Sequence, residues 1–184
     1  MMAEPLREMR LTLAGFGGQG VLFAGKVIAS AALIEGREVS WLPSYGPEMR
    51  GGTANCSVTL SDEPIGSPLV TAPNALVAMN QPSFDKFIGD VVSGGVCIVD
   101  TALVADTSAA DGLDVNLYAI AATSLAEEAG LKGLGNIVLV GKLWAETHFC
   151  ERETLDAAID ACVPARKAAM VEKNKQALAL GIEG

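Results

Sequence analysis

The sequence lacks the residue clusters that most metal and electron-transfer sites require. It has one histidine, His148, and four cysteines that stand far apart with no Cys-x-x-Cys pair. The cysteines are Cys56, Cys97, Cys150 and Cys162. This spacing argues against a zinc site or an iron–sulfur cluster held by this chain alone. We therefore expect no metal site here, and we interpret the cysteines as reduced, buried thiols of a cytoplasmic protein.

Signals for membranes and nucleic acids are missing as well. Residues 1–10 carry charges and no apolar signal-peptide core, and Lys26 interrupts the longest apolar stretch, Val21–Ile34. The net charge is −9 and no basic patch is visible, so nucleic acid is not an expected partner. We expect a cytoplasmic chain that neither crosses a membrane nor binds nucleic acid.

What the sequence does contain is a glycine-rich, apolar composition that often accompanies α/β packing. Half of its 184 residues are apolar, 19% are charged and 20 are glycine. This length favours a single domain over residues 1–184. Alternating or apolar runs predict strands at residues 10–14, 37–42, 53–60, 75–79, 96–99 and 115–120, and a brief strand at 67–70. Helical spacing predicts helices at residues 21–35, 82–88, 121–129, 151–163 and 165–180.

Residues 137–149 fit both kinds of element. Their β-branched residues favour a strand, whereas their length without a breaker and Asn136 as a candidate cap favour a helix. The order of elements predicts a three-layer α/β/α sandwich with a mostly parallel, Rossmann-like sheet and a helical C-terminal end.

The first notable loop connects the first strand to the first helix. Residues 14–20 read AGFGGQG, in which Gly15, Gly17 and Gly20 have Gly-x-Gly-x-x-Gly spacing around Gly18 and Gln19. Free backbone N–H groups and the helix dipole favour an anion at such a turn, so it predicts a phosphate, pyrophosphate or carboxylate site. The alternative is that these glycines only permit a tight turn, because the motif is weak by itself.

Dinucleotide binding is the obvious specific form of this site, and the sequence disfavours it. That function needs an acidic residue at the end of the second strand to hold the ribose hydroxyls. That position is occupied by Trp41, Leu42 and Pro43. No arginine stands at the end of this strand to bind a 2′-phosphate either. A plain NAD enzyme is therefore not expected.

A second loop, residues 43–52, reads PSYGPEMRGG and is more distinctive. An arginine here can clamp a phosphate or carboxylate with its planar fork, while a glutamate holds it and a tyrosine stacks or donates a hydrogen bond. The alternative is an internal salt bridge that shapes a docking loop. The candidate ligand residues in this loop are Ser44, Tyr45, Gly46, Glu48, Arg50, Gly51 and Gly52.

Ligands of open parallel sheets bind beyond the carboxyl ends of the strands. We therefore expect both loops to meet there with Asn80 and Gln81 and with residues 100–101. Asp100 is either catalytic or a cap of the following turn. No combination of nucleophile, base and oxyanion donors is recognisable, so we assign no catalytic residue. The chain is interpreted as part of a catalyst.

The two loops together resemble the gamma subunit of 2-oxoacid:ferredoxin oxidoreductases. Residues 15–21 (GFGGQGV) and 43–53 (PSYGPEMRGGT) carry the resemblance, and residues 78–81 (AMNQ), 95–100 (GVCIVD) and 135–141 (GNIVLVG) continue it. It covers nearly the whole chain. The second loop looks closest to subunits for 2-oxoglutarate and branched-chain 2-oxoacids (2-ketoisovalerate), because Met49 departs from the form found in indolepyruvate subunits.

This resemblance implies a definite chemistry. A 2-oxoacid is decarboxylated on thiamine diphosphate, electrons pass through iron–sulfur clusters to ferredoxin, and the acyl group goes to coenzyme A. Thiamine diphosphate, Mg and the clusters belong to partner subunits, namely alpha and beta, with delta as a further candidate. The gamma chain would help to bind coenzyme A and to dock the subunits. In isolation it would be inactive and homodimeric.

Three alternatives remain open from the sequence. The chain is a subunit of an indolepyruvate or pyruvate oxidoreductase, a structural assembly subunit without a ligand, or a free-standing enzyme that uses a nucleotide. The missing ribose carboxylate and the missing catalytic set count against the last of these.

Overall fold

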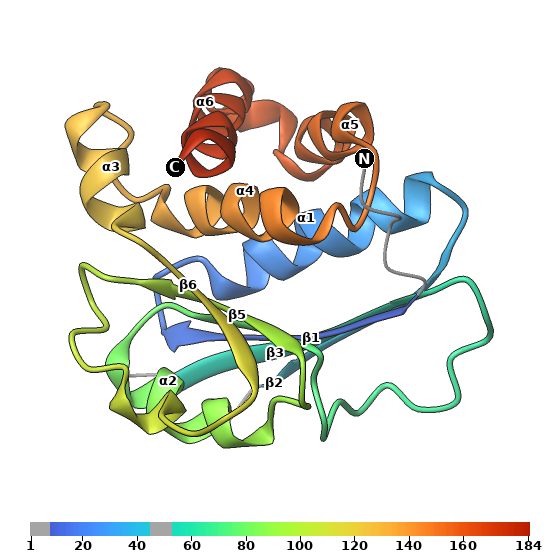
Figure 1. Cartoon of the computed structure of the whole chain (residues 1–184). Helices are drawn as coiled ribbons and strands as arrows, with labels where there is room; N and C mark the ends of the chain where they lie inside the picture. The colour runs from blue at the N-terminus through green and yellow to red at the C-terminus, as the bar shows by residue number, and fades with distance from the viewer. Residues whose placement is uncertain (1–7, 45–52) are drawn as a thin grey trace.

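A computed structural model describes residues 8–44 and 53–184 of the chain. Six strands form one sheet in the order β2-β3-β1-β4-β5-β6 (Figure 1). The strands are β1 (Glu8–Phe16), β2 (Glu38–Ser44), β3 (Thr53–Ser61), β4 (Ala75–Ala78), β5 (Gly95–Asp100) and β6 (Val115–Ile120). β1, β4, β5 and β6 pair in parallel, whereas β3 is antiparallel to both β1 and β2. The prediction of a mostly parallel α/β sheet is confirmed, because only β3 runs against the others.

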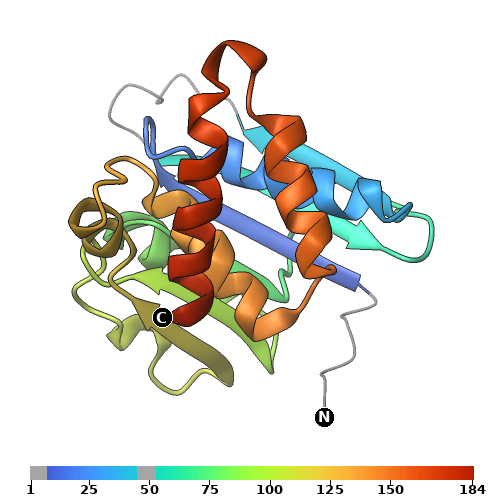
Figure 2. The same ribbon diagram turned by 90° about the horizontal axis from the view of Figure 1, so that it is seen from above.

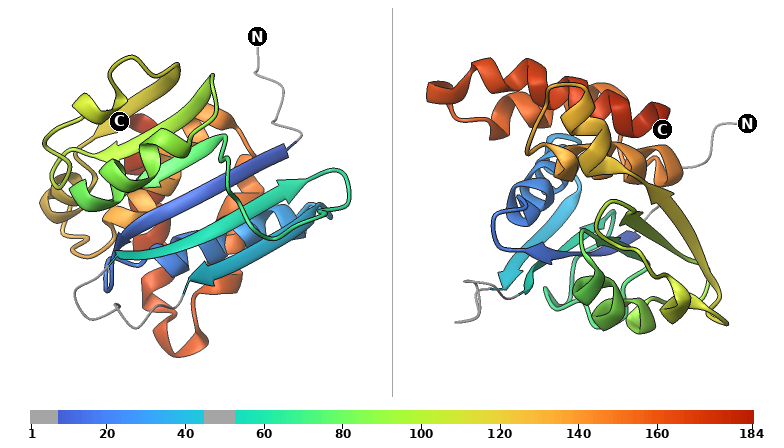
Figure 3. Two further views of the ribbon diagram at one scale, coloured as in Figure 1. Left: turned by 90° about the horizontal axis from the view of Figure 1, so that it is seen from below. Right: turned by 90° about the vertical axis from the view of Figure 1, so that its left-hand side faces the viewer.

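Helices lie on both faces of this sheet. They are α1 (Val21–Ile34), α2 (Gln81–Phe87), α3 (Ala122–Glu128), α4 (Gly135–Thr147), α5 (Arg152–Cys162) and α6 (Ala169–Glu183). Short 3-10 helices span Ile88–Asp90, Ser108–Ala110 and Ala165–Lys167. α1 and α4 cover one face, and α2 lies on the other (Figures 1 and 3). The predicted helical C-terminal end is α5 and α6, which pack on α1 and α4 as a second tier (Figure 2).

Alternate side chains of β3 point into the core. Ala54, Cys56, Val58 and Leu60 are buried beneath α1, as their period of two predicts. All four cysteines are free and buried, which confirms their interpretation as buried thiols. Among the described residues, no helix has the length and apolar character needed to cross a membrane. The brief strand predicted at 67–70 is wrong, since these residues lie in the loop between β3 and β4.

The ambiguous segment at 137–149 is helical as far as Thr147, where α4 ends, and its surroundings explain its composition. Ile137, Val138, Leu139 and Val140 are consecutive and all at most 1% exposed. The first turns of α4 are buried on every side and apolar all round, so they lack the polar stripe that identifies a surface helix. Close packing of α6 on α4 completes the burial, because a Cβ at Gly181 would collide with the Val138 carbonyl oxygen. Asn136 is not the cap of this helix, since Leu134 occupies that position.

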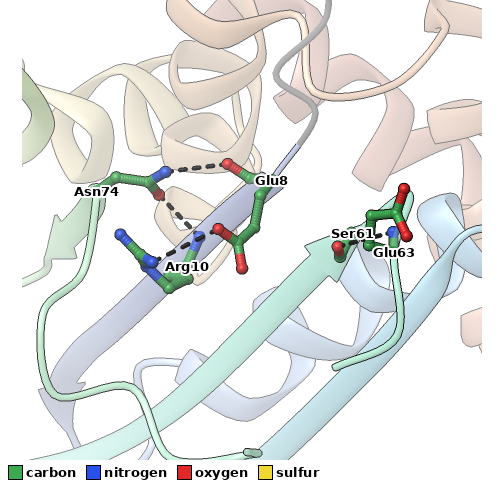
Figure 4. Close-up of polar contacts among 5 residues, drawn as sticks. All are labelled: Glu8, Arg10, Ser61, Glu63 and Asn74. Atoms are coloured by element: carbon green, nitrogen blue, oxygen red, sulfur yellow. Dashed lines mark hydrogen bonds and ion pairs between the residues drawn. The ribbon is translucent and has the colours of Figure 1, made fainter. Parts of the chain in front are cut away.

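At the end of the sheet away from the glycine loop, the Asn74 side chain joins the start of β4 to β1 (Figure 4). Its Oδ1 accepts a hydrogen bond from the Arg10 backbone N–H at 2.7 Å, and its Nδ2 donates to the Glu8 carbonyl at 2.9 Å. These bonds place the start of β4 against β1. The Ser61 hydroxyl accepts from the Glu63 backbone N–H at 3.0 Å and turns the chain out of β3. The register of the central strands is therefore fixed at this end.

Candidate functional site

The candidate site lies where two neighbouring parallel strands send their helices to opposite faces of the sheet. β1 continues into α1 on one face, and β4 continues into α2 on the other (Figure 1). Such a switch in direction opens a crevice beyond the carboxyl ends of the two strands, where ligands of α/β sheets bind. Residues 15–20 and the pair Asn80–Gln81 border this crevice, as predicted.

Gln19 bridges the crevice and holds the glycine loop to the end of β4. Its Oε1 accepts hydrogen bonds from the Phe16 backbone N–H at 2.5 Å and from Asn80 Nδ2 at 3.2 Å. Its Nε2 donates to the Met79 carbonyl at 3.1 Å. A Cβ at Gly15 would lie 2.7 Å from Gln19 Oε1, so glycine is required there for this side chain to fold back. Gln19 therefore shapes the loop from within.

The outer side of the same loop has the backbone geometry that the predicted anion site requires. Gly18 and Gly20 have φ values of 95° and 76°, a left-handed backbone that favours glycine. Within residues 8–44 and 53–184, no heavy atom lies within 4 Å of a Cβ built on Gly18. Gly20 is the N-cap of α1 and offers no side-chain cap, so the first-turn N–H groups of the helix have no capping side chain among the described residues.

A shallow depression of about 270 Å³ lies over this helix end. It is lined by Phe16, Gly17, Gly18, Gly20, Val21, Leu22, Phe23 and Ala54. These residues combine backbone donors with apolar side chains and no acidic group. The depression can therefore accept a phosphate without electrostatic repulsion from its own lining.

A separate cavity of about 230 Å³ lies on the other side of Gly18 and Gln19. Its lining is Gly18, Gln19, Met79, Asp100, Leu103, Thr123, Glu127, Lys132, Gly133, Gly135, Asn136 and Leu139. Two carboxylates and one ammonium group face it, so it differs in charge from the depression over α1. The sequence analysis missed the contributions of Thr123, Glu127 and Lys132. In the sequence, only the glycine-rich turn at residues 130–135 indicates that the chain returns to the neighbourhood of the glycine loop.

Asp100 closes the turn after β5, which decides between its two predicted roles. The carboxylate is 1% exposed. Its Oδ1 accepts from the Ala102 backbone N–H at 3.1 Å, and its Oδ2 accepts from the Thr123 N–H at 3.2 Å and from the Thr123 hydroxyl at 2.6 Å. With these partners Asp100 is a cap that ties β5 to α3.

Asn80 and Gln81 also have structural tasks. Asn80 is the N-cap of α2, and its Oδ1 accepts from the Ser83 N–H at 2.9 Å. Gln81 Oε1 accepts from the backbone N–H groups of Ala105 and Asp106, each at 3.0 Å. The structure thus brings these two predicted ligand residues to the crevice, where the Asn80 side chain caps α2 and bonds Gln19 and the Gln81 side chain holds the loop after β5.

Asn136 joins the glycine loop to α4. Its Nδ2 donates to the Gly20 carbonyl at 3.1 Å across 116 positions of sequence. Its Oδ1 is buried and has no hydrogen-bond partner among the described residues. The sequence offers Asn136 as a candidate cap, whereas in the structure it positions Gly20, the last residue of the glycine loop.

Of the second loop, the structure describes only the beginning. Ser44 ends β2 and pairs with Asn55, which also pairs with Ala14 of β1. Ser44 therefore lies at the same end of the sheet as the glycine loop, two strand spacings or about 10 Å away. The other predicted residues, Tyr45, Gly46, Glu48, Arg50, Gly51 and Gly52, lie outside the described residues, and their roles stay predictions.

The described residues contain no group of three or more His, Cys, Asp or Glu side chains arranged to hold a metal ion. Burial raises the pKa of Cys56 to about 12, with Trp41 opposing the shift through a hydrogen bond, and burial alone raises the pKa of Cys97 to about 12. Neutral thiols of this kind are poor nucleophiles and poor ligands. His148 caps the C-terminus of α4 with a φ of 46° and packs against the Trp144 ring.

Comparison with known proteins identifies the family. Residues 10–184 match the family described as "Pyruvate ferredoxin/flavodoxin oxidoreductase". The 2-oxoglutarate synthase subunit KorC of Methanocaldococcus jannaschii is 40% identical over 179 residues, which are 96% of this chain and 92% of KorC. The ketoisovalerate oxidoreductase subunit VorA of Methanothermobacter marburgensis is 48% identical over 139 residues. That match covers 76% of this chain and only 28% of VorA.

Solved structures agree with this assignment. The gamma subunit of a keto/oxoacid ferredoxin oxidoreductase from Geobacter sulfurreducens has a TM-score of 0.81 at 31% identity, covering 95% of this chain and 96% of that one. The 2-oxoglutarate:ferredoxin oxidoreductase of Magnetococcus marinus, solved with 2-oxoglutarate, coenzyme A and succinyl-CoA bound, has a TM-score of 0.83 at 22% identity. That match covers 96% of this chain and 30% of the larger chain, and it shows a shared fold. The chain belongs to the pyruvate ferredoxin/flavodoxin oxidoreductase family, with gamma subunits of 2-oxoacid:ferredoxin oxidoreductases among its relatives.

Proposed function

From this family membership we propose that the chain works as the gamma subunit of a thiamine-diphosphate-dependent 2-oxoacid:ferredoxin oxidoreductase. The complex would decarboxylate a 2-oxoacid oxidatively, pass the electrons to ferredoxin and transfer the acyl group to coenzyme A. KorC, which this chain matches along nearly its whole length, supports 2-oxoglutarate as substrate, and VorA supports a branched-chain 2-oxoacid. Indolepyruvate and pyruvate are less well supported.

Within such a complex, this chain's own task is to bind the phosphates of coenzyme A. The observation that carries this proposal is the start of α1, where Gly20 caps the helix without a side chain and the space outside Gly18 is open. Backbone N–H groups and the helix dipole attract a diphosphate there. Arg50 of the second loop would supply a cation to the same anion or to a neighbouring subunit.

The chemistry itself we assign to partner subunits, alpha and beta with delta as a further candidate. Asp100 is fully occupied as a cap, and the thiols are buried. A general base or nucleophile needs to reach its substrate, and none of these groups can. The isolated chain is therefore expected to be inactive. Four buried free thiols also suit a reducing compartment, so we propose the cytoplasm as its location.

A docking role is supported by apolar side chains on the surface. Trp41 and Leu42 of the edge strand β2 are each 37% exposed, directly before the second loop. Leu33 and Ile34 at the end of α1 are 66% and 51% exposed. Exposed large apolar side chains of this kind can contribute to interaction surfaces. They fit docking to partner subunits in the complex and self-association as a homodimer in isolation.

The competing function is an assembly subunit that binds no ligand. Gln19, Asn80 and Gln81 favour it, because their side chains are used to hold the fold. This alternative predicts that coenzyme A neither binds nor stabilises the chain.

An anaerobic pull-down of the tagged chain from its own cells tests the proposal. Co-purification of subunits with thiamine diphosphate and iron–sulfur clusters, and ferredoxin reduction that depends on a 2-oxoacid and coenzyme A, is the expected result. Gly17→Val and Arg50→Ala variants of the complex should raise the KM for coenzyme A, with Lys86→Ala on α2 as a control. A chain that purifies alone contradicts the proposed complex. Unchanged KM values in both variants would contradict the proposed coenzyme A site.

A further inference from the structure

The two edge strands of the sheet, β2 and β6, differ in how well they are protected from pairing with another strand. β2 carries Glu38 at its start and Pro43 near its end, and charged residues and prolines hinder such pairing. β6 reads VNLYAI, with neither a charge nor a proline, and pairs with β5 residue for residue over its whole length. It lies at the outer margin of the sheet (Figures 2 and 3). An edge strand of this kind is a template for a further strand.

The hydrogen bonds of β6 show which of its backbone groups point away from the sheet. The Ile120 carbonyl accepts from the Thr101 N–H, directly after β5, at 3.0 Å. Because backbone groups alternate in direction along a strand, the even-numbered residues of β6 face β5. Val115, Leu117 and Ala119 therefore direct their N–H and C=O groups outward. Among residues 8–44 and 53–184, no strand pairs with this side of β6.

These three outward residues are self-complementary. When a strand pairs with its own copy in antiparallel fashion, the two chains are related by a two-fold axis. With the axis at Leu117, that residue faces Leu117 of the second copy, and Val115 faces Ala119 of the second copy. All three outward residues then lie in pairs that exchange two N–H···O bonds each. An axis at Tyr118 would place Val115 beyond the end of the opposite strand, so the arrangement about Leu117 uses more of the edge.

Charge and side chains favour a second copy as the occupant of this edge. Each copy carries a net charge of −9, so two copies meet with least repulsion at an uncharged surface such as β6. Val115 and Leu117 pack on the small apolar cluster beneath β4 and β5, and contact between the two Leu117 side chains would continue that layer across the axis. Leu113, 40% exposed and two residues before β6, would extend the contact toward the start of α3 of the second copy.

We infer that two copies of this chain associate through the outer edge of β6, so that their sheets join into one continuous sheet. The inference rests on the self-association proposed above and names its surface, and it holds whether or not the chain binds coenzyme A. The crevice beyond β1 and β4 stays open in this arrangement. The exposed apolar side chains of β2 lie at the opposite edge of the sheet and stay free for other subunits.

Disulfide cross-linking of the full chain tests the register. In Leu117→Cys, the two Cα atoms across the axis would be about 5.5 Å apart, a separation that a disulfide bridges. The four native cysteines are buried and do not compete. Leu42→Cys is the matched control, because Leu42 lies in the same row of the sheet as Leu117 but on the opposite edge strand. Under mild oxidation, Leu117→Cys should give a cross-linked dimer on a non-reducing gel and Leu42→Cys should not.

A second pair of variants tests the edge without a new cysteine. Ala119→Pro removes an outward N–H of an exposed residue and leaves the bonds to β5 in place, since edge strands tolerate proline on their outer side. It should fold, as circular dichroism will report. Its dimer dissociation constant in sedimentation equilibrium should rise at least about tenfold, because each dimer loses two hydrogen bonds. Ala119→Val keeps the N–H and should dimerise like the wild type.

The outcomes distinguish this inference from the proposed function. A wild-type chain that stays monomeric at micromolar concentrations overturns the inference, whereas the proposed complex still stands if the chain co-purifies with its partner subunits. A dimer that cross-links through Leu42→Cys, or that persists unchanged in a folded Ala119→Pro variant, shows that another surface mediates self-association and also overturns it. A dimer joined through β6 in a chain that purifies without partner subunits supports the inference and contradicts the proposed complex.

Discussion

Gly20, the residue that joins the glycine loop to α1, allows the sharpest prediction. Its φ of 76° is a left-handed conformation. A Cβ at this position would collide with Asn136 Nδ2 and lie 3.0 Å from Asn136 Cγ. Gly20→Ala should therefore strain the backbone and displace the side chain that bonds the Gly20 carbonyl.

The magnitude follows from these two effects. A left-handed backbone costs an alanine about 1–2 kcal/mol. Loss of the Asn136 hydrogen bond adds about 1 kcal/mol, and the lower entropy of the unfolded chain returns about 0.5 kcal/mol. We expect Gly20→Ala to reduce the free energy of unfolding by about 2 kcal/mol in urea denaturation of the full chain, followed by circular dichroism.

Gly18→Ala is the matched control. Gly18 has a φ of 95°, and a Cβ built on it meets no heavy atom of the described residues within 4 Å, so only the backbone strain applies and the loss should be about 1 kcal/mol. In a double-mutant cycle, Asn136→Ala should remove the collision and couple to Gly20→Ala by about 1 kcal/mol. Equal losses for the two glycine variants, together with additivity in the cycle, would refute the assigned contact between the loop and α4.

Three further predictions concern the scaffold. The Cys56 and Cys97 thiols should resist alkylation at pH 8 until the chain is denatured. Their folded pKa values are about 12, above the unfolded value, so the free energy of unfolding should fall above about pH 9 by roughly 1.4 kcal/mol per pH unit for each thiol. A free energy of unfolding in urea that does not change from pH 9 to 10 would contradict this. Gly181→Ala should separate α6 from α4 and lower the free energy of unfolding by about 2 kcal/mol, whereas Gly66→Ala, with open space around it, should change it by less than about 0.5 kcal/mol. Asn80→Ala removes the cap of α2 and should cost about 1 kcal/mol by the same measurement; no loss would show that the cap contributes nothing.

The sequence predicts the local elements of this fold well, because periodicity is a local property. The alternation of Ala54, Cys56, Val58 and Leu60 identifies β3 and its buried face. The order of the strands in the sheet, by contrast, could not be predicted from local patterns. That β3 lies between β1 and β2 depends on pairing between distant segments, which no local pattern encodes.

The site was predictable in part for the same reason. Glycine spacing locates the turn between β1 and α1, because the left-handed backbone at Gly18 and Gly20 favours glycine. The side chains that shape the turn could not be predicted in their roles. Gln19 bonds residues about 60 positions away, and Asn136 bonds Gly20 across 116 positions. Their types fit a ligand contact or a helix cap equally well, and only the tertiary packing decides.

Hydrogen–deuterium exchange of the full chain, with and without saturating coenzyme A, tests the central claim most directly. The account predicts slower exchange at residues 16–23, where the first-turn N–H groups of α1 meet the diphosphate, and no change at the distant turn, residues 108–113. Unchanged exchange at residues 16–23 under conditions where coenzyme A is shown to bind would contradict the claim that this glycine loop holds its phosphates.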